Sequence, residues 1–390
     1  MKKVGVGIIG CGGIAQAVHL PNYMRLKDKV KIIAVADIRE DVSNDVGMKF
    51  GAESYDNYHN LLSRDDIDAV TICTRTEDHA SVTIDAAEAG KHILVEKPMA
   101  TDLDDADKMI KAAEKAGVKL MVGHMKRWDQ GFAASKRLIS EGSIGKPFFF
   151  RATTKMPPGG ADNISAPDVK RLDSSVWGGF VAGRKSSYVP QSVGPEAIMA
   201  ERTSSKPEEK HPEIKGLGLM LAAGVYHADL IRWCSGEEFK EITNCTLWPI
   251  NEHGIEGNAI AIGKMKSGAV AVLESFRSVG GKQPPGFEDS LEVIAPGGII
   301  RSEGPLQGWD VVPARTIIYN ENSPSGTYVP LPPSGRYSGE IKHFVECILE
   351  DKEPLTSGYE GRQAVEVSIA AYKCAREERP IQIPLKTSHM

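Results

Sequence analysis

The first third of the chain alternates short apolar runs with stretches whose apolar residues recur every three or four positions. The runs lack polar alternation, so they predict strands that are buried on both faces of a parallel sheet. These predicted strands are VGVGII (4–9), KIIAVA (31–36), DAVTICT (68–74), HILVE (92–96) and KLMVG (119–123). The predicted helices between them are 13–26, 40–50, 77–89 and 102–116. This βαβ alternation indicates a doubly wound α/β domain over residues 1–123.

Beyond residue 123 the pattern changes. A helix is predicted near 129–141, and FFFRATT (148–154) follows it as a strand. Later runs, spaced as antiparallel strands, are 239–248, 257–265, 269–276, 288–295 and 313–319. Two helical patterns within 338–377, at 338–350 and 360–377, close the chain. We therefore expect residues 124–390 to form an α+β domain with a large, open, mostly antiparallel sheet.

One long segment fits neither pattern. Residues 156–215 contain seven prolines and show little periodicity. Irregular segments of this length in compact proteins are usually functional. We expect a long loop or lid insertion there.

Composition narrows the classes of function. The 390 residues are 41% hydrophobic and 25% charged, with a net charge of −5, so we expect no nucleic-acid partner. No apolar stretch approaches the roughly 20 residues that span a bilayer, so no membrane association is expected. The six cysteines are scattered without a C-x-x-C pair. This pattern predicts reduced thiols, no metal site and a cytoplasmic location.

A glycine-rich stretch, GIIGCGGIA (7–15), directly follows the first predicted strand and begins a helix. In this context G-x-G-x-x-A predicts a dinucleotide site. Gly10 permits the tight turn, Gly12 lets the backbone approach a pyrophosphate, and Ala15 allows close helix packing. Gly13 and Ile14 lie in the first helical turn, whose free N–H groups attract phosphates.

An acidic residue closes the second predicted strand, where a carboxylate binds the adenosine ribose. This residue, Asp37, favours NAD because a carboxylate repels the 2′-phosphate of NADP. Ile38 and Arg39 follow it as further cofactor contacts, and Arg39 relieves part of that repulsion. The sequence thus predicts a Rossmann domain that binds NAD, with NADP possible.

Three further stretches complete a family pattern. They are CTRTEDHA (73–80), GKHILVEKP (90–98) and GVYHADLIRW (224–233). Together with the glycine loop, they resemble the GFO/IDH/MocA family of glucose-fructose oxidoreductase and inositol dehydrogenase. The resemblance implies a Rossmann domain, a second domain on a large open sheet, and NAD(P)-linked chemistry on a sugar or cyclitol. It also implies subunit contacts through that sheet, hence a homodimer or homotetramer.

The E-K-P motif of that family is matched by Glu96, Lys97 and Pro98. The resemblance implies that Glu96 and Lys97 lie at the nicotinamide and that Lys97 touches the reacting hydroxyl. A cationic lysine stabilises a developing alkoxide, and the positive nicotinamide lowers the pKa of that lysine. Pro98 is a candidate for a cis peptide bond. A solvated surface turn is the alternative reading.

The same resemblance places Thr74 and His79 at the cofactor, through the family's T-P-N-x-x-H segment. Arg75 and Thr76 replace its proline and asparagine. A packed core histidine remains the alternative for His79.

The second-domain motif of the family departs here. Its Asp position holds Ala222 and its His position holds Tyr226, while His227 comes one residue later. The resemblance therefore implies Tyr226 as the second catalytic group, as in the branch of glucose-fructose oxidoreductase. For a tyrosine to act as a base, its pKa must fall, and we expect Lys97 to lower it. A core aromatic is the alternative reading of Tyr226.

Four residues complete the predicted substrate site beside Lys97 and Tyr226: His124, Arg127, Trp128 and His227. His124 or the 156–215 segment can replace the missing Asp–His pair. Lys126, Arg127 and Trp128 match the family's segment after the sixth strand, where they suit the hydroxyls of a sugar or a carboxylate, with solvated helix-entry charges as the alternative. For His227, a packed, hydrogen-bonded side chain is the alternative.

The leading hypothesis is an NAD(P)-dependent sugar or polyol dehydrogenase or reductase that transfers a hydride at a hydroxyl-bearing carbon. Two alternatives stay open. One is a glycoside-cleaving enzyme that oxidises a sugar transiently with bound NAD and then eliminates the aglycone. The other is a non-catalytic NAD-binding regulatory protein, which a large separation of Lys97 and Tyr226 would favour.

Overall fold

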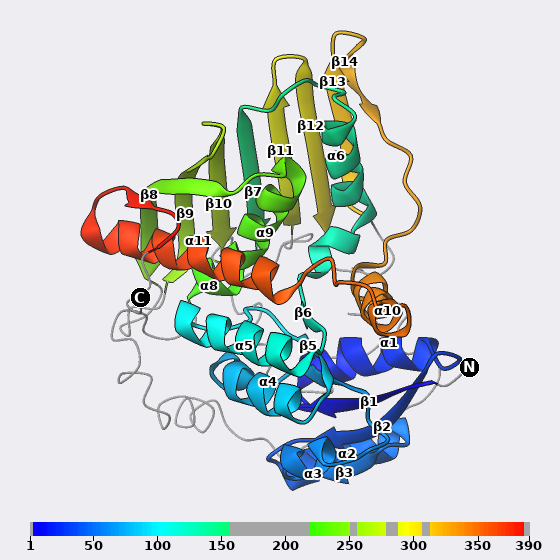
Figure 1. Ribbon diagram of the computed structural model, residues 1–390. Coiled ribbons are helices and arrows are strands. Elements are labelled where there is room, and N and C mark those ends of the chain that lie inside the picture. Colours follow the sequence, from blue (N-terminus) through cyan, green and yellow to red (C-terminus); the bar gives the residue numbers. More distant parts are fainter. Residues whose placement is uncertain (1–2, 156–217, 250–255, 278–287, 306–312, 386–390) are drawn as a thin grey trace.

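The computed structural model describes residues 3–155, 218–249, 256–277, 288–305 and 313–385. The expected loop or lid at 156–215 lies outside the described residues. Two sheets dominate the described part, one in each half of the chain, and helices pack between them (Figure 1).

The first sheet is parallel, with the order β3-β2-β1-β4-β5-β6. Its strands are β1 (Val4–Ile9), β2 (Val30–Ala36), β3 (Glu53–Tyr55), β4 (Ala69–Ile72), β5 (His92–Val95) and β6 (Leu120–Val122). Five of them confirm the predicted apolar runs. The missed strand, β3, is a three-residue edge strand with the sequence ESY, so it has no apolar run to detect.

The helices of this half follow the predicted stretches closely. They are η1 (Ala15–His19), α1 (Leu20–Arg25), α2 (Glu40–Phe50), α3 (Tyr58–Leu62), η2 (Thr76–Asp78), α4 (His79–Glu88) and α5 (Leu103–Ala116). The helix predicted at 13–26 is divided, because a π-helical turn, η1, precedes α1. Such turns are rare and occur often at functional sites. The short α3 was not predicted.

The second sheet has nine strands in the order β14-β13-β12-β11-β7-β10-β9-β8-β15. They are β7 (Phe149–Lys155), β8 (Phe239–Pro249), β9 (Glu256–Met265), β10 (Val270–Phe276), β11 (Glu288–Ala295), β12 (Gly298–Pro305), β13 (Arg315–Asn320), β14 (Ser323–Tyr328) and β15 (Ile381–Gln382). All described neighbours pair antiparallel except β7 and β10. The expected mostly antiparallel sheet is therefore confirmed, although the strands β12, β14 and β15 were missed.

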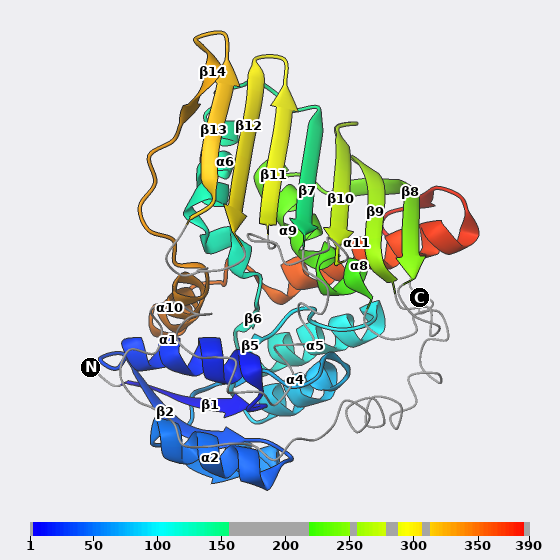
Figure 2. The ribbon, with the colours of Figure 1, turned by 180° about the vertical axis from the view of Figure 1, so that it is seen from behind.

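Helices cover one face of this sheet and leave the other face open (Figures 1 and 2). The covering helices are α6 (Gln130–Ser140), α8 (Leu219–Ala222), α9 (Gly224–Ser235) and α11 (Gly358–Glu377). One helix of the second half, α10 (Arg336–Leu349), does not cover this sheet. It returns to the first half of the chain and lies beside α1. Its Ile341 and Phe344 join the core around Val6 and Ile8 of β1.

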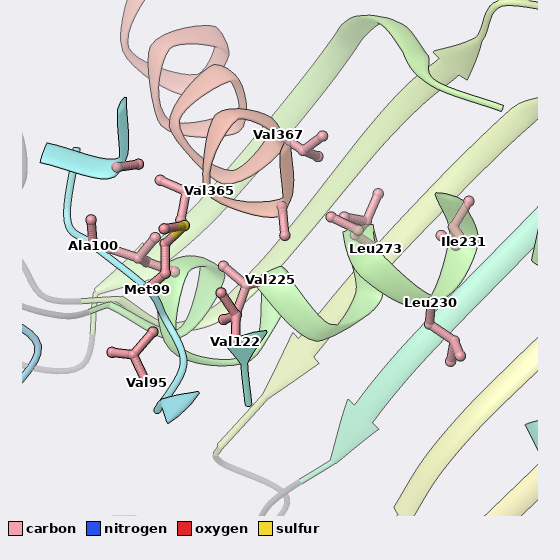
Figure 3. Close-up of a cluster of buried hydrophobic side chains, with 14 of the residues drawn as sticks. Val95, Met99, Ala100, Val122, Val225, Leu230, Ile231, Leu273, Val365 and Val367 are labelled. Atoms are coloured by element: carbon pink, nitrogen blue, oxygen red, sulfur yellow. The ribbon is translucent and has the colours of Figure 1, made fainter. Parts of the chain in front are cut away.

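One hydrophobic core also runs across the junction of the two halves (Figure 3). Val95 and Val122, at the ends of β5 and β6, lie in the same buried cluster as Val225 of α9 and Val365 of α11. Burying apolar surface across this junction stabilises one arrangement of the halves. The strand ends of the first half are thus held against α9.

Asp129 joins the elements around α6. Its side chain caps α6 by accepting from Gly131 N at 2.8 Å, and it also accepts from Ala314 N at 3.1 Å. Arg336 Nε, which is fully buried, donates to Asp129 Oδ2 at 2.7 Å. This carboxylate compensates part of the charge of Arg336, whose Nη1 also donates to Asp289 at 3.2 Å.

We therefore expect Asp129→Ala to destabilise the protein by about 3–5 kcal/mol, because it leaves a buried guanidinium short of a carboxylate. Urea unfolding followed by tryptophan fluorescence measures this loss. The control is Lys352→Ala, which removes an exposed ion pair with Glu350 and should not move the midpoint. Equal midpoints for the two variants would contradict the role given to Asp129.

Candidate active site

The candidate site lies at the carboxyl edge of the parallel sheet. The strand order reverses between β1 and β4, and ligands of doubly wound sheets bind beyond the strand ends at such a switch point. The glycine loop follows β1, Asp37 follows β2, and Lys97 follows β5. Sequence segments far apart therefore meet at one edge.

The glycine loop divides its two roles between two residues. Gly10 has φ +90°, and a Cβ there would lie 2.6 Å from the backbone of Cys73, so the fold itself requires glycine. At Gly12, a Cβ would meet no atom within 4 Å. The neighbouring Gly13 and Ile14 are half-buried, and Ala15 is fully buried against the sheet. Gly12 thus faces space in which a pyrophosphate fits.

Asp37 braces this loop. Its Oδ2 accepts from Cys11 N at 2.8 Å, and its Oδ1 accepts from Arg39 N at 3.0 Å. A carboxylate offers about four acceptor sites, so two remain for ribose hydroxyls. Arg39 Nε lies 3.7 Å from Asp37 Oδ1, and Ile38 is 91% exposed beside it. These residues fit the adenosine end of a dinucleotide.

Hydrogen bonds of the Glu96 carboxylate hold the E-K-P turn (residues 96–98). Glu96 Oε1 lies 2.8 Å from His19 Nε2, and Glu96 Oε2 accepts from Lys97 N at 3.2 Å. Burial raises the pKa of Glu96, but the hydrogen bond from His19 and the charge of Lys97 outweigh it and lower the pKa overall. The Lys97–Pro98 peptide is cis, as predicted.

Lys97 itself reaches into the second half of the chain. Its Nζ donates to the carbonyl of Ala222, the last residue of α8, at 3.3 Å. The side chain is half-buried, and burial lowers the pKa of its ammonium group despite the nearby Glu96 carboxylate. Ala222, which stands at the Asp position of the motif, therefore contributes its backbone oxygen to Lys97 in place of a carboxylate.

Tyr226, in the first turn of α9, lies beside Lys97, as the sequence predicts. The Nζ atoms of Lys97 and Lys126 each lie 4.9 Å from its ring centroid. The predicted fall in its pKa is wrong. Burial raises the pKa of Tyr226 well above its ordinary value, with Tyr337 and Glu96 adding to the effect. The two ammonium groups contact the ring face, and burial of the phenol outweighs them.

His124 follows β6, the strand next to β5, and its ring meets the Tyr226 ring edge-on at 6.0 Å. The side chain is 1% exposed. Among the residues that the structure describes, neither ring nitrogen has a hydrogen-bond partner. Burial lowers the pKa of His124, with Asp229 opposing and Arg127 adding to the effect.

The prediction that His79 contacts the cofactor is not supported, since its ring is occupied within the protein. Its Nδ1 lies 2.9 Å from the Pro98 carbonyl, and its Nε2 lies 3.3 Å from the Thr74 carbonyl. The side chain is buried, and burial lowers its pKa. His79 therefore ties the end of β4 to the E-K-P turn, and only half-buried Thr74 remains beside the cofactor edge.

Arg127 is not a free substrate ligand. Its guanidinium is buried, donates to both oxygens of Asp229 at 2.6–3.1 Å, and also bonds Glu360 and the Leu355 carbonyl. All three guanidinium nitrogens therefore donate within the protein, and Arg127 ties η3 (Met125–Trp128) to α9 and α11.

The structure also corrects the assignments of Trp128 and His227. Trp128 packs on α10, with its ring 5.4 Å from that of His343. His227 points to the large sheet, where its Nε2 lies 2.8 Å from Thr154 Oγ1 and its Nδ1 lies 3.4 Å from Ser275 Oγ. Burial, aided by Lys126, lowers the pKa of His227 to about 3. It is a neutral, hydrogen-bonded core residue.

Sequence reasoning missed one residue of this region, His19, and assigned another, Lys126, to a substrate contact. Lys126 is buried against the ring of Tyr226, and its Nζ donates to Asp289 Oδ1 at 2.6 Å. His19 was hidden as one more residue of the first helix, although it bonds Glu96. Its only sequence signal is a histidine on the buried face of the helix that follows the glycine loop.

The site thus has a dinucleotide-binding edge with a buried cluster of Lys97, His124 and Tyr226 next to it. This arrangement defines an NAD(P)-dependent oxidoreductase with a Rossmann fold. Residues 4–124 match the model of an oxidoreductase family with an NAD-binding Rossmann fold, and residues 195–301 match the GFO/IDH/MocA C-terminal domain. The chain belongs to the GFO/IDH/MocA family.

Known relatives align over nearly the whole chain. Myo-inositol 2-dehydrogenase of Thermotoga maritima is 26% identical, covering 97% of this chain and 98% of the relative. The NAD(+)-dependent scyllo-inositol 2-dehydrogenase of Bacillus subtilis is 23% identical, covering 99% and 98%. The structure of aldose-aldose oxidoreductase from Caulobacter crescentus, complexed with glycerol, shares the fold with a TM-score of 0.74 at 22% identity, covering 98% and 100%.

The described residues lack two further features. None of their helices is long and apolar enough to cross a membrane. Within the same residues, no three histidine, cysteine or acidic side chains gather in a way that suits a metal ion.

The two glycines of the loop generate a paired prediction. Gly12→Ala should leave the melting temperature unchanged and weaken NADH binding by at least tenfold, about 1.4 kcal/mol, because the methyl group occupies only the ligand's space. Gly10→Ala should itself destabilise the fold by about 1–3 kcal/mol, through its positive φ and the clash with Cys73. Thermal melts and NADH fluorescence titrations measure both. Equal effects of the two substitutions on melting would contradict the division of roles.

Proposed function

We propose that this protein oxidises a hydroxyl-bearing carbon of a cyclitol or sugar derivative with NAD(P)+, or runs the reverse reduction, with the reacting hydroxyl held at Lys97. The observation that carries the proposal is the meeting of Lys97, from the dinucleotide half, with Tyr226 and Ala222, from the other half. The named relatives act on inositols, which supports the substrate class.

The cofactor supplies the hydride acceptor or donor. The turn at Gly10 would place Gly12, Gly13 and Ile14 to hold its diphosphate, and Asp37 would hold its adenosine ribose. We propose NAD as the preferred form, since the Asp37 carboxylate keeps acceptor capacity beyond the Cys11 and Arg39 N–H groups and would repel a 2′-phosphate. Arg39, 3.7 Å from that carboxylate, leaves NADP as a weaker alternative.

Lys97 acts as the electrostatic element of the site. Its ammonium group donates to the substrate oxygen and stabilises the charge that develops there. The Ala222 carbonyl at 3.3 Å fixes its direction, and the Tyr226 ring at 4.9 Å supports its charge through a cation–π contact. Tyr226, whose pKa is raised, serves as a wall of the site and a neutral hydroxyl.

A substrate panel tests the function directly. Purified protein is mixed with NAD+ or NADP+ and with inositols, aldoses, uronates and glycosides, and NADH absorbance and sugar products are both followed. Net NADH formation with a cyclitol or free sugar is expected. Aglycone release without net NADH would replace the proposal with transient oxidation and elimination. Cofactor binding without any turnover would leave a regulatory protein.

Lys97→Met should lower kcat/KM by about 10³-fold while NADH affinity changes less than threefold, because the lost charge acts on the substrate oxygen. The control is Lys108→Met, which removes an exposed lysine of α5 and should leave turnover unchanged. An active Lys97→Met enzyme would contradict the mechanism.

Assembly and location complete the proposal. The open face of the nine-stranded sheet (Figure 2), with exposed Trp248 and Tyr328 on its strands, supports a homodimer or homotetramer. Light scattering of the purified protein tests this, and a monomer at micromolar concentration would contradict it. All six cysteines are free thiols, which supports a reducing compartment such as the cytoplasm.

A further inference from the structure

The reaction proposed above needs a proton acceptor that Lys97 and Tyr226 do not supply. Oxidation of an alcohol releases the hydroxyl proton as the hydride leaves carbon. Lys97 as an ammonium ion is a donor only, and the raised pKa of Tyr226 keeps its phenol protonated.

Four other basic groups near Lys97 and Tyr226 are already committed within the protein. Each has partners among the described residues: Glu96 with His19 and Lys97 N, Lys126 with Asp289 and Thr154, His79 with Pro98 and Thr74, and His227 with Thr154 and Ser275. Recruiting any of them as a base would break a buried hydrogen bond.

His124 is the exception. It is 1% exposed, and neither of its ring nitrogens has a partner among the described residues. Leaving a buried polar group unsatisfied costs roughly 1–3 kcal/mol, so each such case calls for a reason. A ligand that completes the hydrogen bonds is a sufficient reason, and the His124 ring lies at the end of β6, edge-on to the Tyr226 ring that Lys97 also contacts.

From this geometry we infer that His124 is the general base of the oxidation, receiving the proton of the hydroxyl group that Lys97 holds. The inference rests on the proposed function. The O–H bond breaks and its proton passes to the unprotonated ring nitrogen. The oxygen electron pair forms the C=O bond, and the C–H pair leaves as hydride to the oxidised nicotinamide. The imidazolium then gives the proton to a water molecule that replaces the departed product, and in the reverse reaction it is the acid.

The surroundings of His124 suit this exchange. Lys97 faces it from the turn after β5, Arg127 from η3, Tyr226 and Asp229 from α9, and Glu360 from α11. Burial and the two cations favour the neutral ring, whereas Asp229 and Glu360 favour the charged ring. Because burial dominates, the ring is neutral and ready to accept a proton near neutral pH, and the rate of oxidation should fall as pH decreases through its pKa.

The test uses His124→Ala in the full-length protein, with the first panel substrate that the wild type oxidises. We expect NADH affinity within threefold of wild type, a loss in kcat/KM of about 10²–10⁴-fold, and loss of the acidic limb of the pH profile. Added imidazole, which fits the space that the substitution leaves, should restore turnover in proportion to its unprotonated fraction.

The matched control is His227→Ala, which removes an equally buried histidine whose nitrogens are both bonded. The pH profile of this variant should keep its acidic limb, and added imidazole should not raise its turnover. A second variant, His124→Gln, fills the space and should be inactive yet folded, which separates lost chemistry from lost structure.

A readout without turnover comes from histidine ring ¹⁵N NMR of the cofactor-free protein, with His124 assigned by its absence in the variant. A neutral ring at pH 7 is expected, and a protonated ring there would overturn the inference. It would also be overturned by a His124→Ala enzyme that keeps its acidic limb and needs no imidazole, while the proposed function would stand. If the wild type oxidises nothing in the panel, the proposed function fails and this inference fails with it.

Discussion

The buried ion pair between Arg127 and Asp229 is the interaction on which the candidate site depends. Arg127 lies three residues after His124, and Asp229 lies one helical turn after Tyr226, so the pair sets the approach of these two rings. Both partners are buried, and Asp229 keeps its charge because Arg127 offsets the cost of burial. Removing either partner would leave a buried charge and free α9 to shift over the sheet edge.

Much of the fold follows from hydrophobic patterning alone. Strands buried on both faces produce apolar runs, so β1, β2, β4, β5 and β6 are evident in the sequence. The strands that were not predicted are the polar β3 and β14, β12, which mixes apolar and polar residues, and β15, which has only two residues. The division of the first predicted helix into η1 and α1 is also invisible to periodicity, since π and α turns present similar faces.

The site was only partly predictable, and for a different reason. Motif position identifies which residues reach a strand end, and this placed Lys97 and Tyr226 correctly next to each other. It does not reveal which polar groups already have partners inside the protein. Arg127 and His227 are residue types that often bind sugars, yet every side-chain nitrogen of both residues is hydrogen-bonded within the protein. His124 and His227 are both buried histidines, but the ring nitrogens of His227 are hydrogen-bonded and those of His124 have no partner among the described residues. Only the structure reveals this difference.

Charge pairing in the interior explains why Lys97, among the buried cations, is the one available to substrate. The other buried cations around the site are matched with carboxylates: Lys126 with Asp289, Arg127 with Asp229 and Glu360, Arg232 with Glu238 and Glu360, and Arg336 with Asp129 and Asp289. In the described part of the chain, the ammonium group of Lys97 has only the Ala222 carbonyl within bonding distance. A carbonyl dipole compensates a charge incompletely, so burial lowers the pKa of Lys97 and leaves donor capacity unused. An oxygen that gains negative charge during hydride transfer would complete that compensation, so the same imbalance that destabilises the resting ammonium group stabilises the transition state.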